Sequence, residues 1–140
     1  RHHRPDISLD PVADQILSEY RHLPLYLVTD GHKIVQHLKV RSLGLERRFK
    51  RIFITHRFGK KYAKPSTYCF EKIKNSESCD WHEMMYIGDD PAKDFVNLKP
   101  LGIRTVRVLT GAHKDANYGE AFEASVVMHD LSALRAEVHV

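Results

Sequence analysis

The sequence predicts an α/β fold in which a parallel sheet is covered by helices on both faces. Short apolar, β-prone runs recur along the chain, and each stops at turn residues; they occupy residues 25–28, 51–55, 84–87 and 103–108. The segments between them carry apolar residues at helical spacing. Strands that alternate with helices form βαβ units, and such units build a parallel sheet through right-handed crossovers.

The first half of the chain contains two expected helices. The first begins at Pro11, because Asp10 is a good N-cap and proline suits the first helical position. Its apolar residues share one face: Val12, Ile16, Leu17 and Tyr20. The second follows the strand at 25–28 and ends at Gly44, which is expected to adopt a left-handed conformation. Its inward residues would be Ile34, Val35, Leu38 and Leu43.

The second half repeats the alternation of strands and helices. A helix capped by Ser66 is expected between the second and third strands. Another helix is expected to open at Pro91, to carry Phe95, Val96 and Leu98, and to end at Gly102. The remaining elements are a glycine-containing loop at 110–119, a strand at 126–128 and a short helix at 131–134.

The composition is that of an ordinary globular domain. The chain has 140 residues, of which 42% are apolar and 29% are charged, so one domain with a buried core is expected. No apolar run approaches the roughly 20 residues of a membrane span, and no secretory signal opens the chain. Cys69 and Cys79 form neither a disulfide framework nor a zinc pattern. These observations predict a cytoplasmic protein without a membrane partner.

The chain is basic, with a formal charge of +4 at pH 7 and a pI of about 9.1. Its basic residues are scattered over several segments, among them 47–48, 50–51 and 60–61, with Arg104 and Arg107 further along. Such scatter is typical of a solvated surface, and the aromatic residues that interleave a nucleic-acid-binding face are missing. The sequence therefore predicts no nucleic-acid partner, although anionic substrates would be attracted.

Three of the expected strand ends and loops are polar. Thr29-Asp30-Gly31 follows the first strand, Lys64 lies in the loop after the second, and 88–90, with Asp94 beyond, follows the third. Ligands of open α/β sheets bind at the carboxyl ends of the strands, so these side chains should converge on one edge. A hydroxyl and backbone N–H groups would bind phosphate oxygens, a lysine would neutralise charge, and carboxylates would hold magnesium.

Each of these elements also has a simpler interpretation. Thr29-Asp30-Gly31 alone is more often a turn, and Lys64 alone would be a solvated lysine. Asp90 before a proline would mainly be an N-cap. Asp89 and Asp94 are more telling, because two carboxylates beside one site repel each other unless a cation lies between them. The order and spacing of the three elements together favour a phosphate site with a divalent cation.

These segments resemble the motifs of the haloacid dehalogenase-like (HAD) hydrolases. Residues 25–31 resemble the second HAD motif, an apolar strand ending in serine or threonine that binds the transferring phosphoryl group. Ala63-Lys64-Pro65 resembles the third motif, whose lysine stabilises the phosphoryl charge and the nucleophile. Residues 86–94 resemble the fourth, a GDxxxxD motif that holds magnesium. Residues 101–106 are similar to the family's passage into its fourth strand, so the resemblance covers nearly the whole chain from Asp10 onward.

The resemblance implies a Rossmann-like three-layer fold and a magnesium-dependent hydrolase that acts on a small phosphate ester through an aspartyl-phosphate. Thr29 and Lys64 would assist catalysis, and Asp94 would ligate the metal through water or orient Lys64. The implied phosphate-binding residues are Thr29, Asp30, Gly31 and Lys64, and the implied Mg²⁺-binding residues are Asp89, Asp90 and Asp94. Superfamily members mostly act on phosphate esters, which favours a phosphatase over a dehalogenase.

One motif of the family does not occur. HAD enzymes open with DxDx(T/V), whose first aspartate attacks phosphorus and whose second is a general acid and base, and the 140 residues contain no such motif. The chain begins with Arg1 rather than methionine, so we expect a longer gene product whose first strand and substrate-selecting cap precede it. Residues 1–9 would then be a linker from that cap, and residues 10–140 an incomplete core domain.

Two further expectations follow from the missing motif. The 140 residues alone are predicted to be inactive, and the alternative to a phosphohydrolase is an inactive HAD-like remnant that serves as a binding or regulatory module. In the family the nucleophile strand lies between the strand ending at Thr29 and the strand ending at Gly88. Exposed strand edges recruit partners, so self-association through these edges is also expected.

Overall fold

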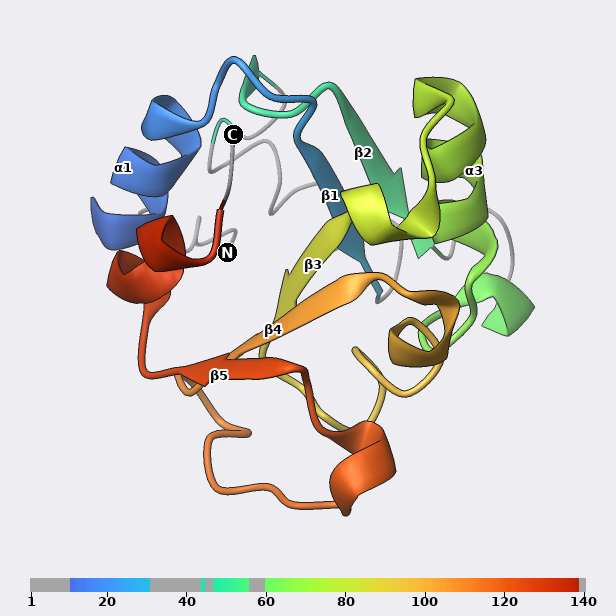
Figure 1. The fold of residues 1–140 in the computed structure, drawn as a ribbon, viewed down its shortest axis with the longest axis vertical. Helices are drawn as coiled ribbons and strands as arrows, with labels where there is room; N and C mark the ends of the chain where they lie inside the picture. The colour runs from blue at the N-terminus through green and yellow to red at the C-terminus, as the bar shows by residue number, and fades with distance from the viewer. Residues whose placement is uncertain (1–10, 31–43, 45–46, 56–59, 139–140) are drawn as a thin grey trace, which may run out of the picture. The chain divides into compact units, whose positions relative to one another are not determined.

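The computed structural model of the chain describes residues 11–30, 44, 47–55 and 60–138. They belong to two compact units, one within residues 1–58 and one within residues 59–140, which are drawn in Figure 1. None of the helices in this part of the chain has the length and apolar character that a membrane span requires. The expected linker at 1–9 and the expected helix at 31–43 lie outside the described residues.

The first unit contains helix α1 (Pro11–Glu19) and strands β1 (Tyr26–Thr29) and β2 (Arg51–Ile54). The strands pair in parallel, with Tyr26 opposite Arg51 and Thr29 opposite Ile54 (Figure 1). Residues from all three elements are buried, namely Ile16, Val28, Phe53 and Ile54. The helix start at Pro11 and both strands confirm the sequence-based expectations for this region.

The second unit contains one α-helix, three strands and several short 3₁₀ helices. They are η3 (Lys60–Tyr62), α3 (Tyr68–Glu77), η4 (Trp81–Glu83), β3 (Met85–Gly88), η5 (Lys99–Leu101), β4 (Arg104–Val108), η6 (Glu120–Phe122), β5 (Val126–Met128) and η7 (Leu131–Ala136). The strands form one parallel sheet in the order β3-β4-β5 (Figure 1). Helix α3 packs on β3 through Phe70, whose ring meets Tyr86 edge-on at 5.0 Å. Parallel strands alternating with helices confirm the predicted α/β class.

The segment after β3 differs from the prediction. Residues 91–98 form a series of turns rather than the expected helix. The backbone hydrogen bonds of this segment do not form a continuous helical series. The Asp94 amide donates to the Asp90 carbonyl at 2.9 Å, and the Lys99 amide donates to the Phe95 carbonyl at 3.0 Å. The Asp94 side chain folds back onto the start of this segment, where it accepts backbone N–H groups. Phe95 and Leu98 are nevertheless buried, so the apolar spacing reports burial rather than a regular helix.

Two smaller expectations also need correction. Helix α3 begins at Tyr68 with Thr67 at its N-cap, and Ser66 accepts a hydrogen bond from the Tyr68 amide at 3.3 Å without being the cap. Arg107 was expected on a solvated surface, but it is 4% exposed. Its guanidinium group donates to Glu123 at 2.8 Å and to the carbonyl of Ala116 at 2.8 Å. Burial of an arginine is tolerated when protein hydrogen bonds replace those that its guanidinium group made with water. Here these hydrogen bonds also hold the loop after β4 in place.

Candidate phosphate and metal site

Lys64 and Asp94 form a buried ion pair in the second unit. The Lys64 Nζ atom donates to Asp94 Oδ1 at 2.7 Å and to the Tyr86 hydroxyl at 2.9 Å. The side chains of Lys64 and Asp94 are 12% and 2% exposed. Burial by itself lowers the pKa of Lys64, but the charges and hydrogen bonds of Tyr86 and Asp94 outweigh it and raise the pKa above its ordinary value. The lysine is therefore a fixed cation at physiological pH.

The second oxygen of Asp94 organises the turn that follows β3. Asp94 Oδ2 accepts the backbone N–H groups of Asp89 at 3.1 Å and Asp90 at 2.8 Å. Gly88 makes this approach feasible, since a Cβ atom there would lie 2.5 Å from Asp94 Oδ2. Both oxygens of Asp94 are thus committed to hydrogen bonds, and Lys64 offsets its charge. The Asp94 carboxylate therefore does not need a metal ion to be stable in this position.

Asp89 and Asp90 differ in how their carboxylates are used. Asp90 Oδ1 accepts the Ala92 amide at 3.0 Å, and Asp90 Oδ2 lies 3.7 Å from His113 Nε2. The Asp89 carboxylate makes no hydrogen bond or ion pair with any residue that the structure describes, and Asp89 is only partly exposed. The loop after β4 lies against it, since a Cβ on Gly111 would be 3.6 Å from Asp89 Oδ2.

The three aspartates differ in how well their carboxylates suit a magnesium ion. Magnesium takes oxygen ligands and is commonly held through one or two carboxylates, with water completing its shell. Asp89 fits this requirement because its carboxylate is uncommitted, whereas Asp94 has both oxygens occupied. Within the described ranges, the one group of three ligand-type side chains within 4.8 Å is instead Asp80, His82 and Glu83, which are exposed. Asp80 and Glu83 form the capping box of η4, so this group has a structural explanation.

In the first unit, the carboxyl ends of β1 and β2 carry the other predicted residues. Asp30 Oδ1 accepts a hydrogen bond from the Thr55 hydroxyl at 2.7 Å, which links the residues that follow the two strands. Thr55 is fully buried, and Thr29 is half-buried with its hydroxyl 3.3 Å from the Asp30 carbonyl. Gly31 lies outside the described residues.

Sequence reasoning missed three residues of these arrangements. Tyr86 lies inside an apolar strand, and the sequence does not show that its hydroxyl reaches Lys64. His113 comes from a loop about twenty residues away from the aspartates, so no local pattern connects it to Asp90. Thr55 ends an apolar strand as Thr29 does, and that parallel is a signal that could have identified it.

The chain matches a family model and several known proteins. Residues 61–134, which carry the Lys64 pair and the acidic turn, match the model of the HAD-hydrolase-like family. The chain belongs to the HAD family. It is similar to the glyceraldehyde 3-phosphate phosphatase of Methanocaldococcus jannaschii, with 34% identity over 93 residues that cover 66% of this chain and 40% of the relative. The matched region is therefore about two fifths of the relative's length.

Solved structures of the HAD family share the fold. A HAD hydrolase from Bacillus subtilis that was solved with magnesium bound has a TM-score of 0.76 and 21% identity, over 94% of this chain and 57% of the other. A predicted phosphoglycolate phosphatase from Haemophilus somnus has a TM-score of 0.75 and 15% identity, over 91% of this chain and 56% of the other. This HAD chain thus spans just over half the length of these structures.

Proposed function

We propose that this chain supplies the phosphate- and magnesium-binding part of a HAD phosphohydrolase that cleaves a small phosphate ester through an aspartyl-phosphate. The observation that carries the proposal is the Lys64–Asp94 pair, whose aspartate also holds the acidic turn at Asp89 and Asp90. A fixed cation beside an uncommitted carboxylate suits a phosphate together with a divalent metal. The names of the relatives, phosphatases of glyceraldehyde 3-phosphate and phosphoglycolate, support a small phosphorylated substrate.

Each residue has a distinct role in this proposal. Thr29 binds a phosphoryl oxygen through its hydroxyl, and the neighbouring Asp30 and Gly31 contribute their backbone to phosphate binding. Lys64 stays protonated and neutralises charge on the phosphoryl group, while Asp94 fixes its position. Asp89 holds magnesium, with Asp90 beside it. Magnesium, when bound, offsets the negative charge of the phosphoryl oxygens.

The nucleophile is proposed to come from outside these 140 residues, because they contain no DxDx(T/V) motif. In this proposal residues 10–140 belong to the core domain and residues 1–9 connect them to a cap. The same missing motif favours a second candidate function, an inactive HAD-like module that binds phosphorylated ligands. In either case, self-association through strand edges and a cytoplasmic location remain predictions.

A comparison of two lysine variants in the complete protein tests the phosphohydrolase proposal. Hydrolysis of a small phosphate monoester with magnesium should fall at least about a hundredfold in Lys64→Met, because transition-state charge would lose its fixed cation. Lys72→Met, which removes a lysine from α3, should retain full turnover. Phosphate binding without turnover in the wild type would favour the inactive module. Equal turnover in wild type and Lys64→Met would contradict the role of Lys64.

A further inference from the structure

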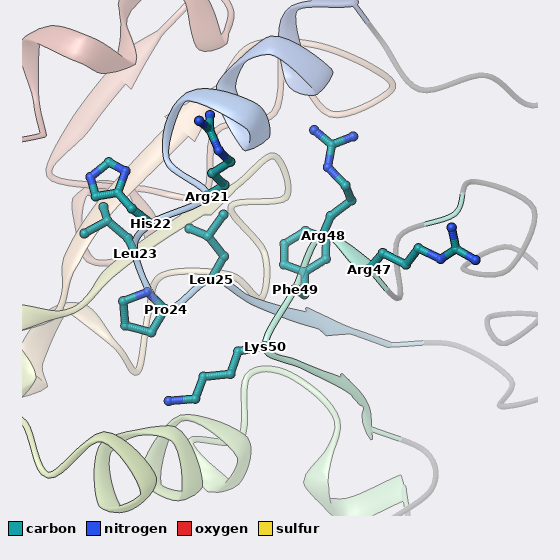
Figure 2. A pocket seen from close by; sticks show the side chains of 9 residues that line it. All are labelled: Arg21, His22, Leu23, Pro24, Leu25, Arg47, Arg48, Phe49 and Lys50. Atoms are coloured by element: carbon teal, nitrogen blue, oxygen red, sulfur yellow. The ribbon is translucent and has the colours of Figure 1, made fainter.

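The proposed function leaves unused a group of basic residues in the first unit. They lie where the chain enters β1 and β2, at the opposite strand ends from Thr29 and Thr55. The Lys50 amide donates to the Leu25 carbonyl at 2.7 Å, so the residues before the two strands lie side by side. A pocket of about 480 Å³ opens among them (Figure 2). This volume lies within the range of about 300–1,000 Å³ that is typical of small-molecule sites.

The lining of this pocket is strongly one-sided in charge. Of the nine lining residues that the structure describes, five are basic and none is acidic; the basic ones are Arg21, His22, Arg47, Arg48 and Lys50. Figure 2 shows the charged ends of the arginines and the lysine pointing outward around Leu25 and Phe49. Like charges that line one pocket repel each other even when their ends diverge, and an anion with several charges that binds among them relieves that repulsion.

Two of these arginines are held beside the same serine. Arg21 donates to the Ser18 carbonyl at 2.7 Å and Arg48 donates to the Ser18 hydroxyl at 2.9 Å, so two guanidinium groups meet at one serine. Arg48 also pairs with Asp14. Arg47 is exposed and makes no ion pair or hydrogen bond with any residue in the described part of the chain.

We propose that this pocket binds an oligophosphate, that is, two or three linked phosphate groups, either free or carried by a nucleoside. Guanidinium groups bind phosphate oxygens in pairs, and several of them around one pocket match a ligand with several phosphates better than a single phosphate. Leu23, Leu25 and Phe49 are half-buried in the same lining and offer an apolar surface for a base.

The pocket is a second site, separate from the predicted phosphate site at the end of β1. Leu25 and Thr29 are four residues apart, which corresponds to about 13 Å along an extended strand. Because none of the described lining residues carries a carboxylate, oligophosphate binding there should not require a divalent metal. Magnesium would instead compete, since it neutralises the ligand's charge.

Calorimetry on the complete protein with sodium tripolyphosphate in metal-free buffer tests this inference. The double variant Arg21→Ser/Arg47→Ser should bind at least about tenfold more weakly than wild type, because two charge-assisted contacts are lost. The control Lys72→Ser/Lys74→Ser removes the same charge from α3 and should bind as wild type does. Arg47→Lys should weaken binding less than the double variant does, because it keeps the charge and loses only the paired guanidinium contact. Unchanged thermal unfolding would show that the variants fold. Hydrolysis of a phosphate monoester should be unchanged in the pocket variant.

Several results would overturn the inference. Among them are an absence of tripolyphosphate binding, equal weakening in the pocket and control variants, and binding that Lys64→Ala abolishes while the pocket variant leaves it intact. Orthophosphate with the same affinity as tripolyphosphate would likewise exclude an oligophosphate site. A comparison of ATP with tripolyphosphate shows whether the oligophosphate is free or carried by a nucleoside. ATP that binds about tenfold more tightly than tripolyphosphate indicates a nucleotide, and equal affinities indicate the free phosphate chain. Adenosine alone should not bind.

Discussion

Lys64 with Asp94 and Arg48 with Asp14 are both cation–carboxylate pairs, but they lie in different surroundings. The Lys64 and Asp94 side chains are 12% and 2% exposed, and Asp94 accepts two further backbone N–H groups. The Arg48 and Asp14 side chains are 26% and 56% exposed, and a second guanidinium group shares Ser18 with Arg48. Lys64 and Asp94 thus balance each other's charge in a buried setting, whereas Arg48 and Asp14 are more exposed and have a second guanidinium group beside them.

Under the two proposals, this difference corresponds to two ways of binding phosphate. A buried, fully hydrogen-bonded cation is held in place before any ligand arrives, which is what stabilisation of a reacting phosphoryl group requires. An exposed cluster of cations attracts anions and can adjust to them, which suits binding rather than catalysis. On this comparison, the Lys64–Asp94 pair contributes strongly to the stability of the fold and the Arg48–Asp14 pair contributes little.

Asp94→Leu should have the largest effect on stability. The substitution leaves Lys64 buried without its carboxylate partner, and the backbone N–H groups of Asp89 and Asp90 lose their acceptor. The free energy of unfolding should therefore fall by about 3–5 kcal/mol. Asp94→Asn keeps an acceptor in place and should lose less. Urea unfolding of both variants gives the comparison, and a loss below about 1 kcal/mol in Asp94→Leu would show that the pair is not structural.

Tyr86→Phe should have an intermediate effect of about 1 kcal/mol. It removes the hydroxyl that accepts from Lys64 at 2.9 Å and preserves the ring that packs on Phe70. Tyr118→Phe is the matched control, since Tyr118 is 53% exposed and should show almost no change. Urea unfolding again supplies the measurement, and equal values for the two variants would remove Tyr86 from the network.

Arg48→Met should change the free energy of unfolding by less than about 1 kcal/mol, because exposed ion pairs contribute little. Added salt should reduce even this difference, since exposed charges are screened. The measurement is urea unfolding at low and high salt. A salt-independent loss of several kcal/mol would mean that the Arg48 pair resembles the Lys64 pair after all.

The smallest expected effect concerns pH. The pKa of Lys64 is raised in the folded protein, so its contribution to stability is complete below its unfolded value of about 10.4 and is lost only as pH rises through the higher folded value. The difference in unfolding free energy between wild type and Lys64→Met should therefore stay constant from pH 7 to about 10. A difference that shrinks by pH 9 would show that Lys64 loses its proton in the native protein.

The sequence predicted the strand positions well because a buried parallel strand is a short apolar run that stops at turn residues. Tyr26–Thr29 and Met85–Gly88 both lie within one or two residues of the expected runs. The helix expected from Pro91 to Gly102 is replaced by turns at 91–98, because apolar spacing indicates burial, while the Asp94 side chain competes for the backbone groups around it.

The contacts within the sites depend on segments that are distant in the chain. Lys64 and Asp94 are thirty residues apart, and the motif order rather than any local pattern linked them. Arg48 was predicted to belong to a scattered surface charge, because nothing in the sequence shows that Arg48 and Arg21 both reach Ser18. The alternation of side chains along β4 suggests an exposed position for Arg107. Arg107 is buried because the loop after β4 lies against it and accepts hydrogen bonds from its guanidinium group.

Asp89 provides the most direct test of the central proposal, that this HAD chain holds magnesium for the hydrolysis of a phosphate ester. Turnover of a small phosphate monoester by the complete protein should rise with magnesium concentration, and Asp89→Asn should lower it at least about a hundredfold, or about 2.7 kcal/mol in barrier height. Asp115→Asn, in the exposed loop after β4, should match wild type. Turnover that is independent of magnesium, or equal in wild type and Asp89→Asn, would contradict the proposal.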